Sequence, residues 1–451
     1  MEPLIDAQAE ARLHAFLHDI GVILHYKKRR ESFAAYAMGL LSPIERKSAE
    51  PIAALIRPDK ASVDAVHQRL LHFVGVSQWA DEPVRTFAAR YALDAMTERG
   101  PVVSWIVDDT GFLKQGKHSV GVQRQYTGSA GKIANCQIGV SLTVATATMP
   151  LPVDFELYLP RTWTDDPERR KEARIPDSVH FSTKPQLALA MIDRAIANQL
   201  PRGVVLADTA YGNASDFRVG LRRRGLDYGV DIEGRTKIRP MRADGRPGKP
   251  VQAHKLAEGL GIRQFERMSW REGSGQTLWS WFAARRVLVE RDTRALGRAE
   301  VVWLLIEWLR DEPQPTKFTL LTLGEDTSLR DLVRTARHRW PTERVYEDMK
   351  GTIGLDHFEG RRFNGWHHHV TVALCCYAFA AAEHARSFPP SARGSRQGRA
   401  HRRAPRAALR RFSDQRHARH WTRRRSLAAT LPTLLSAITP RRWPHPHVVT
   451  Q

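Results

Sequence analysis

The sequence of 451 residues predicts an α/β fold, with an N-terminal helical domain ahead of a sheet and further helices behind it. Three changes of pattern along the chain predict this fold. Up to about residue 98, apolar residues recur at steps of three and four, as in FAAYAMGLL, which is the period of an amphipathic helix. From Pro101, short β-branched and alternating segments replace that pattern. From Leu329 the helical period returns. We expect the first of these regions, residues 1–98, to form a compact helical domain.

Residues 99–229 are expected to form the first part of the sheet. VVSWIVDD is a β-branched run that closes on two acids, and SVGVQRQY, NCQIGVSLTVAT and LPVDFELYLP follow as an antiparallel meander with Gly-rich joints. KPQLALAMIDRAIANQL then has helical periodicity, and GVVLADTAYG is a short buried strand that ends on an acid. The predicted order is three strands, a helix and a strand.

The rest of the chain divides into three segments. Residues 230–325 are mostly β-like and predict a β-rich insertion, although VVWLLIEWL also fits a helix. Residues 326–385 contain two helices split at Pro341, which suits a first helical turn, and then one apolar helix. Residues 386–451 are a basic, low-complexity tail with little to bury, which predicts disorder, or order only on nucleic acid.

The charge balance indicates a polyanionic partner. The chain has 70 Lys and Arg against 48 Asp and Glu, a formal net charge of +22, and such a field attracts nucleic acid. The alternative explanation of this positive charge is a high-GC organism whose codon usage favours Arg over Lys. Three cysteines without CxxC spacing fit a reducing compartment, and the sequence shows neither a basic leader nor an apolar stretch of about 20 residues. We therefore expect a cytoplasmic, nucleoid-associated protein that does not enter a membrane.

Acids at the ends of two predicted strands are the first candidates for chemistry. Asp108 and Asp109 close the first apolar strand, and Asp208 closes the short strand VVLA. In open α/β sheets, ligand sites collect at the carboxyl ends of the strands. The competing explanations are solvated turn acids for the pair and a helix cap for Asp208.

The helix that begins near Pro341 carries a third acid. Glu343, Glu347 and Lys350 follow at steps of four and three and share one face, with Arg339 just before the helix. A solvated salt-bridge face would give the same pattern. Together with the strand acids, however, a third carboxylate completes the ligand set of two-metal phosphoryl transfer, in which two divalent ions lie about 3.5–4 Å apart. Carboxylate ligands favour Mg²⁺ or Mn²⁺.

These motifs resemble a known family. Acids on the first and fourth strands look like the ribonuclease H-like core, a mixed five-stranded sheet with flanking helices. RW..E......K resembles the Y-R-E-K signature of bacterial insertion-sequence transposases, in which an Arg precedes the catalytic Glu by four residues and a Lys follows it by seven. DDTGF.K.G, SVGVQRQY.G..GK..NCQ, LAD..YG and GLDHFEGR resemble the branch called DDE superfamily endonucleases. The signature Tyr is absent, since Ala336 stands in its place.

The resemblance implies roles for single residues. The catalytic acids and metal ligands would be Asp109, Asp208 and Glu343, which would hold two Mg²⁺ or Mn²⁺ ions. Asp109 is the member of the acidic pair that Thr110 follows, and Glu343 rather than Glu347 fits both signature spacings. Six cations would contact DNA phosphates near the acids and along the flanking strand: Arg339, Lys350, Lys114, Lys117, Arg124 and Lys132.

The resemblance also implies a function. The expected protein is a DNA transposase whose residues 1–98 bind terminal inverted repeats and whose core cleaves them and transfers strands to target DNA, as a homodimer on DNA. In relatives the insertion can stack a flipped base on a Trp, and the candidates here are Trp279, Trp281, Trp303 and Trp308. The alternative is that these four tryptophans are buried residues of the sheet. A stand-alone ribonuclease H-like nuclease and an inactive DNA-binding derivative of a transposase fit the same residues.

Overall fold

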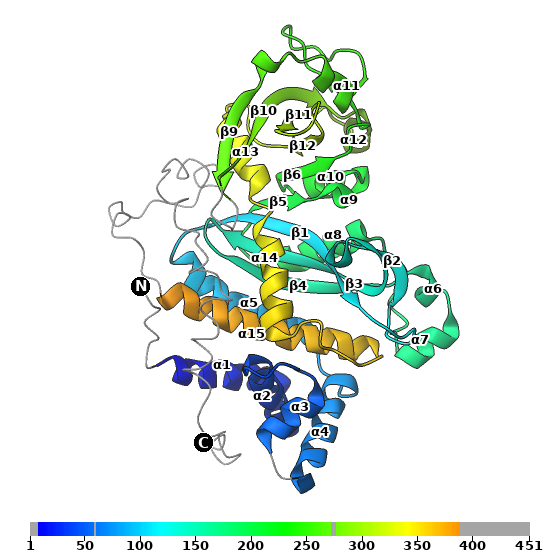
Figure 1. Ribbon diagram of the computed structural model, residues 1–451, viewed down its shortest axis with the longest axis vertical. Helices are drawn as coiled ribbons and strands as arrows, with labels where there is room; N and C mark the ends of the chain where they lie inside the picture. The colour runs from blue at the N-terminus through cyan, green and yellow to red at the C-terminus, as the bar shows by residue number, and fades with distance from the viewer. Residues whose placement is uncertain (1–7, 58–59, 272–276, 388–451) are drawn as a thin grey trace.

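A computed structural model describes residues 8–57, 60–271 and 277–387 of the chain. The predicted basic tail lies outside the described residues from residue 388 onward. A large mixed sheet with helices packed around it forms the middle of the molecule, with N-terminal helices at one end and a β-rich region at the other (Figure 1). The predicted α/β class is therefore confirmed.

The N-terminal residues are helical, as predicted. Five helices follow one another: α1 (Ala9–Leu24), α2 (Lys27–Leu41), α3 (Ala49–Ile56), α4 (Lys60–Gly75) and α5 (Asp81–Thr97). Of these, α5 runs beside α15 (Phe363–Ser387) under the sheet (Figure 1) and contacts the sheet directly. The ring of Phe16 in α1 lies 5.6 Å from that of Phe379 in α15, so the first helix packs on the last. One hydrophobic core therefore joins the N-terminal helices to the sheet.

The central sheet has the predicted five strands in mixed orientation. Its strands are β1 (Val102–Leu113), β3 (Lys132–Thr146), β4 (Pro150–Tyr158), β5 (Val204–Ala207) and β6 (Tyr228–Ile232). The spatial order is β4-β3-β1-β5-β6, with the first three antiparallel and β1, β5 and β6 parallel. The helices of this part are α6 (Arg161–Thr164), α7 (Pro167–Ala173), α8 (Lys184–Ala197), α9 (Thr209–Gly212) and α10 (Ser215–Arg223).

The segment SVGVQRQY differs from its predicted place in the meander. Its first half is a turn in which the Val122 amide donates to the Ser119 carbonyl, and Gly121 has a φ of +76°. Only Gln123–Thr127 forms a strand, β2, and it pairs with the first part of β3. Because a glycine turn interrupts the run, β1 pairs with β3 instead, and β2 lies at the edge of the sheet.

The predicted insertion is β-rich and continues the same sheet. Its elements are β7 (Lys237–Pro240), β8 (Val251–Gln252), α11 (Ala253–Glu258), η2 (Ile262–Gln264), β9 (Glu266–Arg271), β10 (Thr277–Leu288), α12 (Glu290–Leu296), β11 (Val301–Leu309) and β12 (Lys317–Leu321). VVWLLIEWL is the strand β11, between β10 and β12, so the helical alternative for it is wrong. β12 also pairs with β6, which joins the insertion to the central sheet.

The chain returns to the sheet through the predicted helices. α13 (Leu329–Arg337) and α14 (Pro341–Asp348) are separate helices with Pro341 in the first turn of the second, and a π-helical turn (Met349–Ile353) follows. α14 crosses in front of the sheet, and α15 runs along its lower side (Figure 1). Within residues 8–387 as described, no helix is both long and apolar enough to cross a bilayer.

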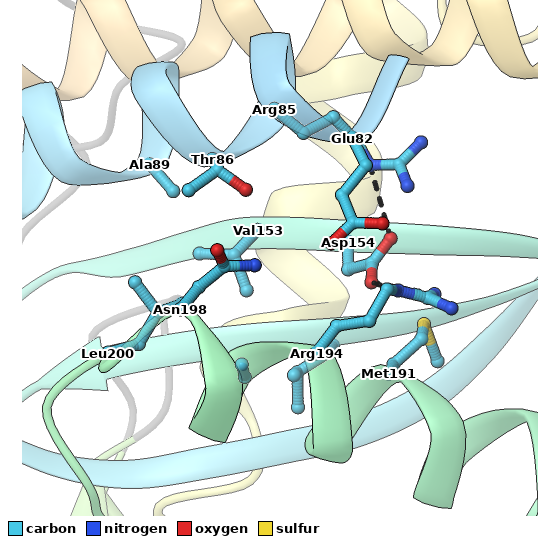
Figure 2. A pocket seen from close by; sticks show the side chains of 12 residues that line it. Glu82, Arg85, Thr86, Ala89, Val153, Asp154, Met191, Arg194, Asn198 and Leu200 are labelled. Carbon is cyan, nitrogen blue, oxygen red and sulfur yellow. Dashed lines mark hydrogen bonds and ion pairs between the residues drawn. The ribbon is translucent and has the colours of Figure 1, made fainter. Parts of the chain in front are cut away.

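Buried charges fix α5 to the sheet. Figure 2 shows the pocket between α5, β4 and α8, where the Asp154 carboxylate lies between two guanidinium groups. Arg85 Nε lies 3.3 Å from Asp154 Oδ1, and Arg194 Nη2 lies 2.8 Å from Asp154 Oδ2. Burial alone would lower the pKa of Arg85, but Asp154 and Asp81 raise it above its usual value. The guanidinium therefore stays charged in the interior and needs its acids.

We expect Arg85→Met to lower the free energy of unfolding by about 3–5 kcal/mol, because it leaves the buried Asp154 without one of its two partners. Urea denaturation followed by circular dichroism measures this. Arg46→Met is the matched control, since Arg46 pairs with Glu359 where both side chains are more than half exposed, and its loss should stay below about 1 kcal/mol. Equal losses for the two variants would contradict the assignment.

Candidate active site

Parallel pairing of β1 and β5 brings two acidic segments to one edge of the sheet. The register pairs Ile106 with Leu206 and Val107 with Ala207, so Asp108 and Asp208 follow at the same level. Side chains at the same level of neighbouring strands point to the same face, and successive residues point to opposite faces. Asp108 and Asp208 therefore start from one face of the sheet, and Asp109 starts from the other.

The two acids of β1 do not end the strand, contrary to the sequence prediction. β1 continues to Leu113, because beyond Val107 it stays paired with β3, from Asp108 opposite Ser141 to Leu113 opposite Cys136. β5 ends at Ala207, so the acids lie where β1 loses its partner on that side. One side of β1 is thus open at the acids while the other side holds them in place.

Asp108 is a half-buried acid that pairs with Arg339. Arg339 Nη1 lies 3.2 Å from its Oδ2, and the Asp109 amide donates to its Oδ1 at 2.8 Å. Burial raises the pKa of Asp108 to about 7; Arg339 lowers it, and Asp208 raises it further. The site therefore holds more carboxylate charge than Arg339 offsets, which favours a further cation.

Asp109 has partners from the other face. Lys184 Nζ lies 3.0 Å from its Oδ2, and the Tyr211 hydroxyl donates to the same oxygen at 3.2 Å. Lys184 is the first residue of α8, behind the capping box of Thr183 and Gln186. The sequence reasoning missed both partners, although TKPQ marks a helix start at the edge where the strands end, and Tyr211 comes three residues after Asp208.

Asp208 caps a helix and also belongs to the acidic cluster. Its Oδ1 accepts a hydrogen bond from the Ala210 amide at 2.9 Å, so the cap anticipated as an alternative exists. Burial raises the pKa of Asp208; Arg339 lowers it, and Asp109 raises it further. A Cβ at Gly212 would lie 1.9 Å from the Asp231 carbonyl oxygen, so α9 packs against β6 without room for a side chain. This close contact holds α9, and with it the cap, against the sheet.

α14 approaches the face that carries Asp108. The hydroxyls of Tyr346 and Ser141 lie 2.6 Å apart, and Ser141 is the cross-strand partner of Asp108. Glu343 is exposed on the first turn of this helix. Burial lowers the pKa of Arg339, but Asp108, Asp231, Asp208 and Glu343 raise it above its usual value. Arg339 therefore lies among acids from both strands and from α14.

Two neighbours of Glu343 on the helix have different surroundings. Glu347 is bound by Arg344, with Nη1 and Oε2 3.1 Å apart, which gives this acid a partner away from the strand acids. Lys350 lies in the π-helical turn, and its Nζ donates to the Gly111 carbonyl at 2.7 Å and to the Ser129 hydroxyl at 3.1 Å. π-Helical turns inside helices occur frequently at functional sites. The turn directs Lys350 toward β1, two residues past Asp109.

The predicted acids approach one another without forming a closed metal site. Among the described residues, no group of three or more His, Cys, Asp or Glu side chains is arranged to hold a metal ion. Asp108 and Asp208 share Arg339, Asp109 is held by Lys184 and Tyr211, and Glu343 lies beyond Arg339. The donors are hard carboxylate oxygens with excess negative charge, so they fit divalent cations of the Mg²⁺ type.

The other predicted DNA contacts come from the segment after β1 and from the hairpin of β2 and β3. Lys114 is half-buried, and its Nζ donates to the Phe358 carbonyl at 2.6 Å, whereas Lys117, Arg124 and Lys132 are exposed. The indole nitrogens of Trp303 and Trp308 donate to backbone carbonyls within the β-rich region, as sheet-packing residues do. The Trp279 ring is covered by two guanidinium groups, at 4.4 Å from Arg267 and 5.5 Å from Arg310, and Trp281 packs edge-on against it.

Known proteins that resemble this chain include transposases. A family model described as "DDE superfamily endonuclease" matches residues 21–277, and one described as "Transposase DDE domain" matches residues 182–379. A curated relative from Microchaete diplosiphon, described as "Probable transposase for insertion sequence element IS701", is 30% identical over 203 residues, which cover 45% of this chain and 48% of the relative. The chain thus aligns with about half the length of that relative.

Proposed function

The chain belongs to the DDE superfamily endonuclease family, whose model matches more than half of its length, and we propose that it is a DNA transposase. On this proposal it cleaves DNA at the ends of an insertion sequence and transfers the cut strands to target DNA. The observation that carries the proposal is Arg339, which lies among carboxylates from β1, from the end of β5 and from α14. Acids from separate elements around one site are what metal-dependent phosphoryl transfer requires.

Asp208, Glu343 and an acid of β1 would hold divalent cations, which we propose are two Mg²⁺ or Mn²⁺ ions. When bound, these ions supply an activated oxygen nucleophile and charge stabilisation for the leaving oxygen. The residues of the chain do the rest: the strands fix two carboxylates, and α14 carries the third. Arg339, released from Asp108 once cations offset the acids, would contact a DNA phosphate.

The acid of β1 is either Asp109, the sequence prediction, or Asp108. Asp109 remains a candidate ligand because its charge raises the pKa of Asp208. Support for Asp108 comes from its level beside Asp208, from its contact with Arg339, and from its position on the face that α14 approaches. The geometry favours Asp108 as the ligand, with Asp109 anchoring Lys184 and Tyr211 beside it.

The remaining assignments follow from the same proposal. Arg339 and Lys350 would bind phosphates at the site, Lys117, Arg124 and Lys132 would bind them along the flanking strand, and Lys114 would join them only by leaving the Phe358 carbonyl. Residues 1–98 would recognise the terminal inverted repeats, ahead of core segments 99–229 and 326–385. The protein would act as a homodimer on DNA in the cytoplasm, since two element ends are processed together.

A stand-alone nuclease with the same core is the second candidate function. It would cut DNA but would not join the cut 3′ end to a second molecule. The acids of β1, at the end of β5 and on α14 argue against a purely DNA-binding derivative, because a binding protein gains nothing from like charges held close together.

Removing the carboxylates should abolish cleavage while DNA binding persists, because ligation is lost and the phosphate contacts remain. With purified protein, end DNA and Mg²⁺ or Mn²⁺, we expect Asp208→Asn, Glu343→Gln and Asp108→Asn to lower the cleavage rate by more than about a thousand-fold. Asp109→Asn should have a smaller effect if it only anchors Lys184. The reverse order of the two β1 variants would return the ligand role to Asp109, and cleavage without a divalent ion would refute the mechanism.

Glu347 provides the internal control for Glu343. Both are exposed acids on α14, but Arg344 binds Glu347, so Glu347→Gln should leave cleavage within about three-fold of the wild type, as surface substitutions usually do. The single-turnover cleavage rate of the two variants, measured side by side, tests this. Loss of activity in Glu347→Gln alone would move the third acid by one helical turn.

Phosphate contacts should be visible in the salt dependence of DNA binding. Lys132→Ala should reduce the slope of log K against log salt for duplex DNA by about 0.9, the contribution of one phosphate contact. Lys255→Ala, which removes an exposed lysine of α11 that pairs with Glu258, is the control and should leave the slope unchanged. Equal slopes for wild type and Lys132→Ala would remove Lys132 from the interface.

A further inference from the structure

The hairpin of β2 and β3 is anchored beside the acidic cluster. Its turn lies against β1, because a Cβ at Gly111 would be 1.9 Å from Thr127 Oγ1. Ser129 in the same turn lies 3.3 Å from the Thr110 hydroxyl and 3.1 Å from Lys350 Nζ. The hairpin is therefore fixed to the strand that carries Asp109 and to the turn that follows α14.

The outer face of this hairpin exposes two large apolar side chains side by side. Tyr126 and Ile133 are direct cross-strand partners, and they are 65% and 60% exposed. Arg124 and Asn135 form the pair two residues away on the same face. Thr127, by contrast, faces inward to Gly111. A cross-strand aromatic–aliphatic pair normally packs under other residues, so its exposure marks a surface that receives a partner.

The charge around the pair indicates what that partner is. From Thr110 to Val153 the sequence has no acid, while it has four Lys and Arg residues. Three of them, Lys117, Arg124 and Lys132, are exposed. An apolar ring among cations and without acids fits a polyanion that also presents flat apolar groups, which describes a nucleic acid strand with unpaired bases. A duplex covers its bases, so the ring would meet a base only where the strands separate.

We propose that Tyr126 and Ile133 form a stacking platform for an unpaired DNA base next to the bond that the acidic site cuts, with Arg124, on the same face, at an adjoining phosphate. The inference rests on the proposed function, because that function supplies the DNA substrate. It adds a contact with a base to the phosphate contacts already proposed. Stacking on an aromatic ring tolerates every base, so the platform would serve strand separation and not sequence recognition.

The test compares two probes that carry the same phosphates. One is a fluorescein-labelled oligothymidylate, and the other is an abasic oligonucleotide of equal length. The full chain should bind the oligothymidylate more tightly. Tyr126→Ala should weaken that binding by about 5- to 150-fold, the range for loss of one stacked base, and leave binding of the abasic probe unchanged. Electrostatic binding of phosphates by any Arg-rich part of the chain affects both probes equally, so the difference between them reports contacts with the bases.

Two variants control for the chemistry of the substitution. Tyr126→Phe keeps the ring and should retain the preference for the oligothymidylate. Ile262→Ala removes an exposed apolar side chain, 48% accessible, from the β-rich region and should leave binding of both probes unchanged. Circular dichroism and the melting temperature check that each variant is folded.

Several outcomes would overturn the platform. These are equal binding of both probes by the wild type, equal weakening of both by Tyr126→Ala, and no weakening of either. A fourth is a change of sedimentation by Tyr126→Ala without a base-dependent loss, which would make this face a contact between copies of the chain. A chain that prefers bases but cleaves no end DNA would refute the transposase proposal alone, and a chain that cleaves end DNA without the base preference would refute the platform alone.

Discussion

The geometry of the site depends on the parallel register of β1 and β5. Val107 lies opposite Ala207, so the next residues, Asp108 and Asp208, come level on one face. Because side chains alternate along a strand, a slip by one residue would exchange Asp108 for Asp109 on that face. Gly203 protects the register, since a Cβ there would lie 2.6 Å from the backbone of Ser104. A side chain at this position would push the two strands apart just where their pairing begins.

Bringing like charges together at a strand end requires a counter-charge from elsewhere in the chain, and Arg339 supplies it. The segment before it is fixed on the sheet: Leu332 of α13 belongs to the same apolar cluster as Ile106, and the His338 ring bonds the Ser104 hydroxyl at 2.8 Å. The packing of α13 on the sheet therefore positions the guanidinium beside the acids.

The sequence predicted the helices and strands better than it predicted how they pair and pack. Periodicity identified the N-terminal helices, the strands with their acids, and the break at Pro341. It missed the continuation of β1 to Leu113, because DDTGF has no apolar alternation and only pairing with β3 keeps it extended. It also left the choice within the Asp108 and Asp109 pair to resemblance, since the face of each acid depends on a register that local sequence does not encode. Lys184 and Tyr211 were invisible as partners for the same reason: tertiary packing of α8 and α9 brings them to Asp109.

Strand pairing at the base of the β-rich region brings residues that are far apart in the sequence to one site. Between Asp208 and Arg339 the chain makes the whole insertion, yet it leaves the central sheet through β6 and returns through β12, which is the antiparallel neighbour of β6. The Thr319 hydroxyl donates to Asp231 at 2.6 Å and ties the two strands at the level of α9. Since exit and entry are adjacent, the length of the insertion adds only a slowly growing loop entropy. The spacing between the second acid and α14 can therefore vary in sequence while the return of Arg339 and Glu343 to β1 stays fixed by strand pairing.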